Sequence, residues 1–394
     1  MLKSFAVRNF QSFHDQVYIS LTLNKHTPDD NRAFISPAGT KLSKVLAVIG
    51  PNASGKTTLI KSLAFLDWFI CHSFQAKVDA PIPLATHFGA TADSSEFELE
   101  FELDGTDWRY HLVASETRVY SEHLYCKLSR AFSYVFSRIW NPGAHCYDIK
   151  QNQFGFLQKE AERVRENASL LSTAAQYQVP LAMKICSMQV FTNMHVMGRH
   201  HLDDWQLFGA SAFYSANDTL RLNMTRLLKS WDLGLSDIRI ERQTVTHANG
   251  DKEDLYIPFG VHTVNDVEHA IMLKQESSGT QAAYLLLFRL LPVLSSGGIA
   301  VIDELEADLH PHLLVSILDL FFSPETNPHN AQIIFTCHSM EVLSLLHKAQ
   351  VVLVEKDPQC QSNAWRLDQV KGIRADDNLY AKYMGGSYGA IPQL

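Results

Sequence analysis

The sequence predicts an α/β protein with a mixed sheet, a core of parallel strands and flanking helices. Three observations lead to this prediction. Lys44–Gly50 is a largely apolar run of strand length, and from Lys56 onward apolar residues recur at spacings of three and four, as on one face of a helix. After about residue 280, strand and helix patterns alternate, which favours parallel strands joined by crossover helices.

Composition excludes several classes of protein. The chain has 394 residues, a net charge of −8 and 19% charged residues, which indicates a globular protein without an overall basic surface. No apolar run reaches the ~20 residues of a membrane span, and the first residues lack the apolar segment of a signal peptide. Six cysteines without a Cys-x-x-Cys pair argue against disulfides and structural zinc. We therefore expect a cytoplasmic protein with no membrane partner.

The pattern along the chain divides it into three parts. Residues 1–150 contain alternating segments, including Phe97–Leu103 before an Asp104-Gly105 hairpin turn. Residues 151–230 lack a strand pattern and are predicted to form a helical insert. Residues 231–394 return to strands, with a turn at Asn249-Gly250, and continue into the alternating strands and helices. We expect the first and third parts to form two lobes of one domain.

A glycine-rich loop follows the apolar strand. Gly50-Pro51-Asn52-Ala53-Ser54-Gly55-Lys56-Thr57 matches Gly-x-x-x-x-Gly-Lys-Thr and opens a helix, which is the context of a P-loop. Such a loop turns backbone N–H groups and a helix N-terminus toward phosphate oxygens. Lys56 would neutralise phosphate charge and Thr57 would hold Mg²⁺. The predicted ATP-binding residues are Asn52, Ala53, Ser54, Gly55, Lys56, Thr57 and Thr58.

The segment Gly297–Glu304 reads as a second apolar strand that ends in two carboxylates, Asp303 and Glu304. Asp303 fits the Walker B position, where an aspartate holds Mg²⁺ through water or through Thr57. Glu304 is then placed to polarise or deprotonate a water in line with the γ-phosphate. Asp-Glu alone is a weak signal, but a P-loop in the same chain makes it a strong one.

A second candidate anion site precedes the long helix before this strand. In Glu276-Ser277-Ser278-Gly279-Thr280-Gln281, a Ser-Ser-Gly turn lies at a predicted helix N-terminus, where N–H groups and the helix dipole favour anions. The alternative is an ordinary helix cap. We predict that Ser277, Ser278 and Gly279 contact nucleotide.

The order of these motifs resembles the ABC-type ATPase heads of the RecF and structural-maintenance-of-chromosomes group. In those heads the signature turn of one subunit closes over ATP bound to the other, which implies a homodimer here. Phe335-Thr-Cys-His338-Ser339 resembles their switch-histidine segment, so the resemblance implies that His338 contacts the γ-phosphate. Leu309-His310-Pro311 occupies the position of their dimer-contact loop. Their Mg²⁺-sensing glutamine is not identified, although Gln151 and Gln153 lie near the predicted join of the lobes.

The wider set of motifs resembles the AAA-type ATP/GTP phosphatase family of abortive-infection proteins, AbiL-like and RloA-like. It adds Asn9-Phe10-x-Ser12-Phe13, Val354–Asp357 and the tail from Tyr383 to the motifs above. The resemblance implies a bacterial antiphage ATPase using ATP and Mg²⁺, as a homodimer or a higher oligomer. It also implies a separately encoded effector, RloB-like or another toxin.

Two other functions remain open on the sequence. A RecF-like DNA-repair ATPase would bind DNA or RNA on a basic face, for which Arg221, Arg226, Lys229, Arg239 and Arg242 are candidates. A nuclease of the overcoming-lysogenisation type would carry a Toprim domain. Val351–Glu355 resembles the start of that domain, but Lys356 replaces the expected glycine and too few residues follow.

Overall fold

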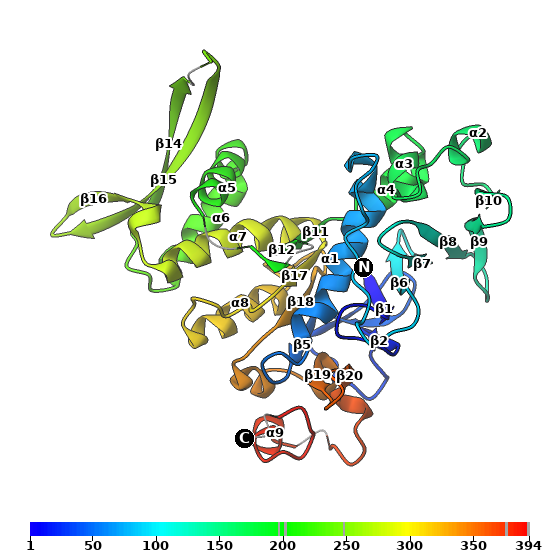
Figure 1. Ribbon diagram of the computed structural model, residues 1–394. Helices are drawn as coiled ribbons and strands as arrows, with labels where there is room; N and C mark the ends of the chain where they lie inside the picture. The colour runs from blue at the N-terminus through cyan, green and yellow to red at the C-terminus, as the bar shows by residue number, and fades with distance from the viewer. Residues whose placement is uncertain (196–197, 201–202, 247–248, 375–376, 392–394) are drawn as a thin grey trace.

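The computed structural model describes residues 1–195, 198–200, 203–246, 249–374 and 377–391. An antiparallel sheet forms one side of the molecule, a mostly parallel sheet forms its centre, and a small three-stranded arm projects beyond the helices on the other side (Figure 1). The predicted mixed α/β architecture with a parallel core is confirmed.

The antiparallel sheet has seven strands in the order β10-β9-β8-β7-β6-β1-β2. The turn between β6 and β7 lies at Asp104 and Gly105, which both have positive φ, so the predicted hairpin is confirmed. The strands are β1 (Leu2–Arg8), β2 (Val17–Ser20), β6 (Ser95–Leu103), β7 (Thr106–Ala114), β8 (Val119–Lys127), β9 (Ser133–Asn141) and β10 (Cys146–Gln151).

The central sheet has six strands in the order β11-β17-β18-β5-β19-β20, and all neighbours are parallel except the last pair. Helix α1 (Lys56–His72) follows β5, α7 (Ser278–Ser296) precedes β17, and α8 (Pro311–Phe322) joins β17 to β18. The strands are β5 (Val45–Ile49), β11 (Val190–Thr192), β17 (Ile299–Ile302), β18 (Gln332–Thr336), β19 (Val351–Lys356) and β20 (Ser362–Arg366).

Alternate residues of β5 serve two different hydrophobic cores. Leu46 and Val48 join the core shared with α1 and the antiparallel sheet. Val45, Ala47 and Ile49 join the core shared with α7 and α8. Side chains of a strand alternate between faces, so a strand covered on both sides is apolar throughout, as the run before the P-loop is.

The segment 151–230 is less uniformly helical than the sequence indicates. It contains α2 (Gln158–Ala161), α3 (Leu170–Gln176), α4 (Pro180–Cys186), α5 (Asp204–Ala216) and α6 (Asp218–Ser230). Between α4 and α5, however, β11 pairs with β17, and β12 (Met194–His195) pairs with β13 (Gly198–Arg199). β11 is short, and it supplies hydrogen-bond partners to β17, which would otherwise be the edge of the central sheet.

The projecting arm consists of β14 (Asp237–Thr246), β15 (Lys252–Val264) and β16 (Val267–Met272). Asn249 and Gly250 lie between β14 and β15, which pair antiparallel as predicted. Helix α5 packs against β15, and the chain runs from β16 through a 3₁₀ turn at Leu273–Gln275 into α7 (Figure 1). The arm is therefore connected directly to the Ser-Ser-Gly turn at the start of α7.

Short elements complete the chain. β3 (Ala33–Ile35) and β4 (Lys41–Ser43) form a two-stranded ribbon, and α9 (Leu379–Met384) lies near the C-terminal end (Figure 1). Between β18 and β19, where the alternating pattern favours a crossover helix, the chain forms a 3₁₀ helix, Met340–Ser344. Further 3₁₀ turns lie at Ser73–Gln75, Lys348–Gln350 and Leu367–Gln369.

A buried ion pair joins the antiparallel sheet to α3. The side chains of Glu122 on β8 and Arg138 on β9 are both fully buried and approach to 3.3 Å. Glu122 also accepts hydrogen bonds from Tyr110 Oη, Ser169 Oγ and the backbone N–H of Leu170, at 3.0, 2.7 and 2.9 Å. A buried carboxylate is tolerated only with such partners, so this network fixes where α3 begins.

We expect Arg138→Ala to lower the free energy of unfolding by roughly 3–5 kcal/mol, because it leaves Glu122 buried without its cation. Urea unfolding followed by circular dichroism measures this change. The control is Arg163→Ala, which removes an exposed arginine paired with Glu160 on the neighbouring turn and should change stability by less than about 0.5 kcal/mol. Equal effects of the two substitutions would contradict a structural role for the buried pair.

Candidate functional site

The site lies where three neighbouring parallel strands end. The P-loop follows β5, Asp303 and Glu304 follow β17, and Thr336 ends β18, which lies between the other two strands. Ligands in open parallel sheets bind at such carboxyl ends. A cleft of about 710 Å³ opens here, and it is lined by Ser12, Asn52, Ala53, Ser54, Gly55, Lys56, Thr57, Thr58, Glu304, Thr336, His338 and Lys356.

Close backbone approaches explain the two glycines of the loop. A Cβ at Gly50 would collide with the carbonyl oxygen of Val354 on β19. Gly55 has a φ of 110°, and a Cβ there would collide with Ser362 Oγ and lie 2.9 Å from Ser12 Oγ. Side chains are excluded at both positions, so the loop backbone lies against β19 and β20 while its other side faces the cleft.

Lys56 is held by the loop that it follows. Its Nζ donates to the carbonyl oxygens of Gly50 and Pro51, both at 2.9 Å, and the residue is buried. Burial lowers the pKa of Lys56, while the nearby charges of Asp303 and Glu304 oppose that shift. Both hydrogen-bond partners of the Lys56 ammonium are neutral carbonyl oxygens and not carboxylates. The ammonium can therefore also bind an anion in the cleft.

Asp303 and Thr57 present oxygen atoms to one point. Thr57 Oγ1 lies 3.0 Å from both carboxylate oxygens of Asp303, and Thr336 Oγ1 donates to Asp303 Oδ1 at 2.7 Å. Burial raises the pKa of Asp303, and the hydrogen bonds from Thr336 and Thr57 oppose the rise. Hydroxyl and carboxylate oxygens are the ligands that Mg²⁺ prefers, so this pair fits the cation predicted here.

Two serine hydroxyls in the cleft support a polar ligand. Ser12 Oγ and Ser54 Oγ are buried and have no hydrogen-bond partner among the residues that the structure describes. An unpaired buried hydroxyl costs roughly 1–3 kcal/mol, which a bound group with acceptor oxygens would offset. The donor set of the cleft therefore fits phosphate groups and a hard cation.

Glu304 and His338 lie opposite each other at the cleft. Glu304 has a φ of 50°, and its backbone N–H donates to Thr336 Oγ1 at 2.7 Å. His338 Nε2 lies 3.6 Å from Glu304 Oε1, and both side chains are about 40% exposed. The backbone N–H groups of His338 and Ser339 both contact Glu306 Oε1, which fixes the loop after β18.

Sequence reasoning missed three residues of this site. Asn193 donates to the carbonyl oxygen of Asp303 and accepts from its N–H, both at 2.8 Å. Arg199 contacts the carboxylate of Glu304, and Thr336 contacts both carboxylate-bearing residues. Thr336 belongs to the switch-histidine segment and could have been assigned from it. Asn193 and Arg199 could not, because their place depends on β11 lying beside β17.

The Ser-Ser-Gly turn lies apart from the cleft of its own chain. Ser277 caps α7 by accepting a hydrogen bond from the N–H of Thr280 at 3.1 Å. Ser277 and Ser278 are exposed, and neither they nor Gly279 line the cleft. A Cβ at Gly279 would lie 2.8 Å from the carbonyl oxygen of Asp308. The structure therefore brings together the P-loop, Asp303, Glu304 and His338. The turn at 277–279, which is predicted to contact nucleotide bound to a second chain, lies outside this cleft.

Several of the charged residues considered for other functions have structural partners. Glu355 accepts from the N–H of Ala390 at 3.0 Å, and within the described ranges no three His, Cys, Asp or Glu side chains cluster as a metal site. This gives no support to a Toprim centre. Among the basic candidates, three form local ion pairs, Arg221 with Asp218, Arg239 with Glu268 and Arg242 with Asp254. They do not form an unpaired basic face.

The two glutamines considered as Mg²⁺ sensors lie elsewhere. Gln151 ends β10, the outermost strand of the antiparallel sheet, and donates to Gln158 Oε1 at 3.2 Å. Neither Gln151 nor Gln153 lines the cleft. Gln11 is nearer to it, because its Oε1 lies 3.4 Å from Thr58 Oγ1 on α1.

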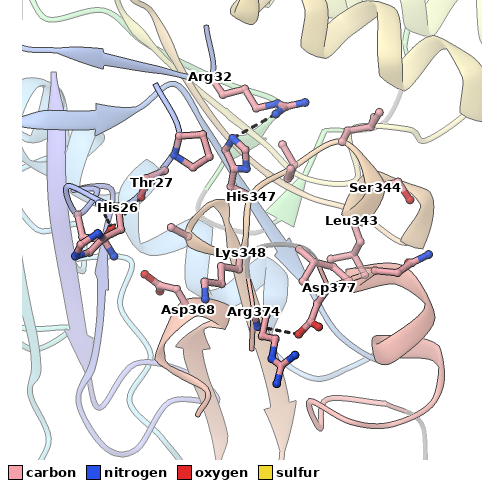
Figure 2. Close-up of a pocket in the computed structure, with 17 residues that line it drawn as sticks. His26, Thr27, Arg32, Leu343, Ser344, His347, Lys348, Asp368, Arg374 and Asp377 are labelled. Atoms are coloured by element: carbon pink, nitrogen blue, oxygen red, sulfur yellow. Dashed lines mark hydrogen bonds between the residues drawn. The ribbon is translucent and has the colours of Figure 1, made fainter. Parts of the chain in front are cut away.

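A second cavity, of about 680 Å³, lies between the chain that follows β2 and the C-terminal segment (Figure 2). Two of its basic residues, His347 and Lys348, already have polar partners. His347 Nε2 lies 2.7 Å from Asp30 Oδ2 and 3.3 Å from Arg32 Nη1, and Lys348 Nζ donates to the carbonyl oxygen of Ile373 at 2.6 Å. None of the motif residues lines this cavity, so we assign it no chemistry.

Within the described residues, no helix is both long enough and apolar enough to cross a bilayer.

A family model described as "AAA domain, putative AbiEii toxin, Type IV TA system" matches residues 45–344, which include the P-loop, Asp303, Glu304 and His338. Among solved structures, the SMC head domain from Thermotoga maritima is similar, with 14% identity, a TM-score of 0.41, and coverage of 93% of this chain and 98% of that one. No curated protein matches the chain.

We expect Lys56→Ala to weaken nucleotide binding about 100-fold, because it removes charge-assisted hydrogen bonds to phosphate worth roughly 2–3 kcal/mol. Titration of a fluorescent ATP analogue measures the affinity. The control is Lys61→Ala, which removes another buried lysine of α1 that does not line the cleft. Wild-type affinity in Lys56→Ala would show that the nucleotide binds elsewhere.

Proposed function

This chain belongs to the family of AAA domains described as putative AbiEii toxins of type IV toxin–antitoxin systems, and from that premise we propose that it is a Mg²⁺-dependent ATPase that acts as a switch. The observation that carries this proposal is the convergence of Lys56, Thr57, Asp303, Glu304 and His338 on one cleft. A phosphate-binding loop, a magnesium-binding pair and a base are the parts that nucleotide hydrolysis requires.

Each residue has a separate role in the proposed reaction. Backbone N–H groups of residues 52–57 and the ammonium of Lys56 bind the phosphates. Thr57 and Asp303 hold Mg²⁺, which when bound offsets the negative charge of the β- and γ-phosphates. Glu304 accepts a proton from the attacking water, and His338 donates a hydrogen bond to the γ-phosphate.

We further propose that two chains form a homodimer around ATP, or a higher oligomer built from such dimers. The support is the position of Ser277, Ser278 and Gly279, which are placed away from the cleft of their own chain at the exposed N-terminus of α7. Backbone N–H groups there suit an anion presented by a second copy. ATP would then draw the heads together, and hydrolysis would release them.

The output of the switch is proposed to be control of a separately encoded effector, RloB-like or another toxin, in an antiphage system. Support comes from the toxin–antitoxin description of the family. The alternative of a DNA-repair ATPase draws no support from the ion-paired arginines.

Complementation between two inactive variants tests the shared site. We expect Lys56→Ala and Ser278→Arg to be inactive separately, the first through its P-loop and the second through steric and charge conflict at the partner's nucleotide. An equal mixture should regain roughly a quarter of wild-type turnover, since half of the dimers then contain one intact composite site. Ser278 is exposed, so its replacement should leave the melting temperature unchanged. A mixture with no regained turnover would contradict a site shared between two chains.

We expect Glu304→Gln to lower turnover by ~10²–10⁴ and to keep ATP binding, because glutamine preserves shape but cannot accept the proton. The ATP-bound dimer should accumulate. Phosphate release and light scattering after size exclusion, with and without ATP, measure the two effects. Wild-type turnover without a larger species would refute both the base and the dimer.

A further inference from the structure

Arg199 connects the candidate base to a neighbouring loop. It lies at the end of β13, and its Nη1 contacts Glu304 Oε2. Its Nη2 lies 3.6 Å from Asp308 Oδ2. The side chain of Arg199 is 31% exposed, so this double ion pair is partly shielded from water. A guanidinium has a planar fork of donors that can hold two carboxylates at once.

The carboxylate of Glu304 is thereby held from two sides. Arg199 contacts one oxygen, and His338 Nε2 lies 3.6 Å from the other. The backbone of Glu304 is also fixed, by its left-handed conformation and its bond to Thr336. Arg199 does not line the P-loop cleft, so it contacts the carboxylate of Glu304 from outside that cleft, whereas His338 lies within the lining.

Neighbouring groups favour this orientation of Arg199. Arg289 on α7 is half-buried, and desolvation together with the nearby charge of Arg199 lowers its pKa to about 10. Repulsion between the two guanidinium groups opposes any turn of Arg199 toward α7 and favours its pairing with Glu304 and Asp308. Asp308 in turn lies against the Ser-Ser-Gly turn, since its carbonyl oxygen would be 2.8 Å from a Cβ at Gly279.

We propose that Arg199 is a positioning residue for ATP hydrolysis, which holds the carboxylate of Glu304 at the cleft and anchors it to the loop containing Asp308. This inference rests on the proposed function, in which Glu304 is the base. A misdirected base transfers protons slowly although ATP still binds, because binding depends on the P-loop, Thr57 and Asp303.

The first experiment compares Arg199→Ala and Arg199→Lys with the wild-type chain in steady-state phosphate release and in ATP and ADP titrations. We expect Arg199→Ala to lower kcat about tenfold or more, with KM and both nucleotide affinities unchanged. Arg199→Lys should regain part of the loss, because an ammonium can pair with Glu304 but lacks the planar fork. The matched control is Arg118→Ala, which removes an arginine of similar exposure paired with Glu166, far along the chain from the site.

The second experiment places Arg199→Ala in the Glu304→Gln background. If Arg199 acts through the Glu304 carboxylate, the double variant should turn over at the same rate as Glu304→Gln alone. If Arg199→Ala lowered kcat in the Glu304→Gln background by the same factor as in the wild-type chain, Arg199 would act independently of Glu304. That result would overturn the proposal.

Three other results would also overturn it. A rise in kcat on Arg199→Ala would identify an inhibitory clamp. A loss of affinity on Arg199→Ala that is larger for ATP than for ADP would show that Arg199 contacts the γ-phosphate directly. Unchanged kinetic constants would show that the ion pair has no role in turnover. Failure of the proposed function would appear separately, as wild-type turnover in Glu304→Gln.

Discussion

The position of β18 between β5 and β17 is the constraint on which the site depends. Neighbouring strands lie about 4.8 Å apart, so the ends of β5 and β17 are separated by about two such spacings. Side chains can bridge that gap, as the 3.0 Å contact between Thr57 and Asp303 shows. Thr336, at the end of the middle strand, fills the space between them and bonds to Asp303 and to the backbone of Glu304.

The remainder of the fold supports this edge from both faces. The antiparallel sheet and α1 cover one face of the central sheet, and α7 and α8 cover the other. β11 extends the sheet beyond β17 and places Asn193 against the backbone of Asp303. β13, which follows β11 and β12 in the chain, carries Arg199, whose side chain contacts the carboxylate of Glu304.

Local sequence patterns were sufficient to predict many elements of the fold and of the site. The P-loop, the apolar β5 and β17, and the turns at Asp104-Gly105 and Asn249-Gly250 depend on residues close in sequence, and the structure has these elements where they were predicted. β11 was not predicted, because three residues carry no periodic signal and the strand is defined by its distant partner β17. Asn193 and Arg199 were missed for the same reason. Gln151 was considered only because it lies near the join in sequence, whereas in space it ends the outermost strand.

Because β5 contributes to two hydrophobic cores, an error in the pairing of this strand affects both cores and the P-loop at once. A shift of one residue in its pairing would move Leu46 and Val48 into the space of Val45 and Ala47, so both cores would be mispacked together. The same shift would displace Gly50 and the P-loop by about 3.3 Å along the strand. A molecule with a misplaced phosphate loop is thus also one with two defective cores, and chaperones and proteases that recognise exposed apolar surface would remove inactive chains without any test of activity.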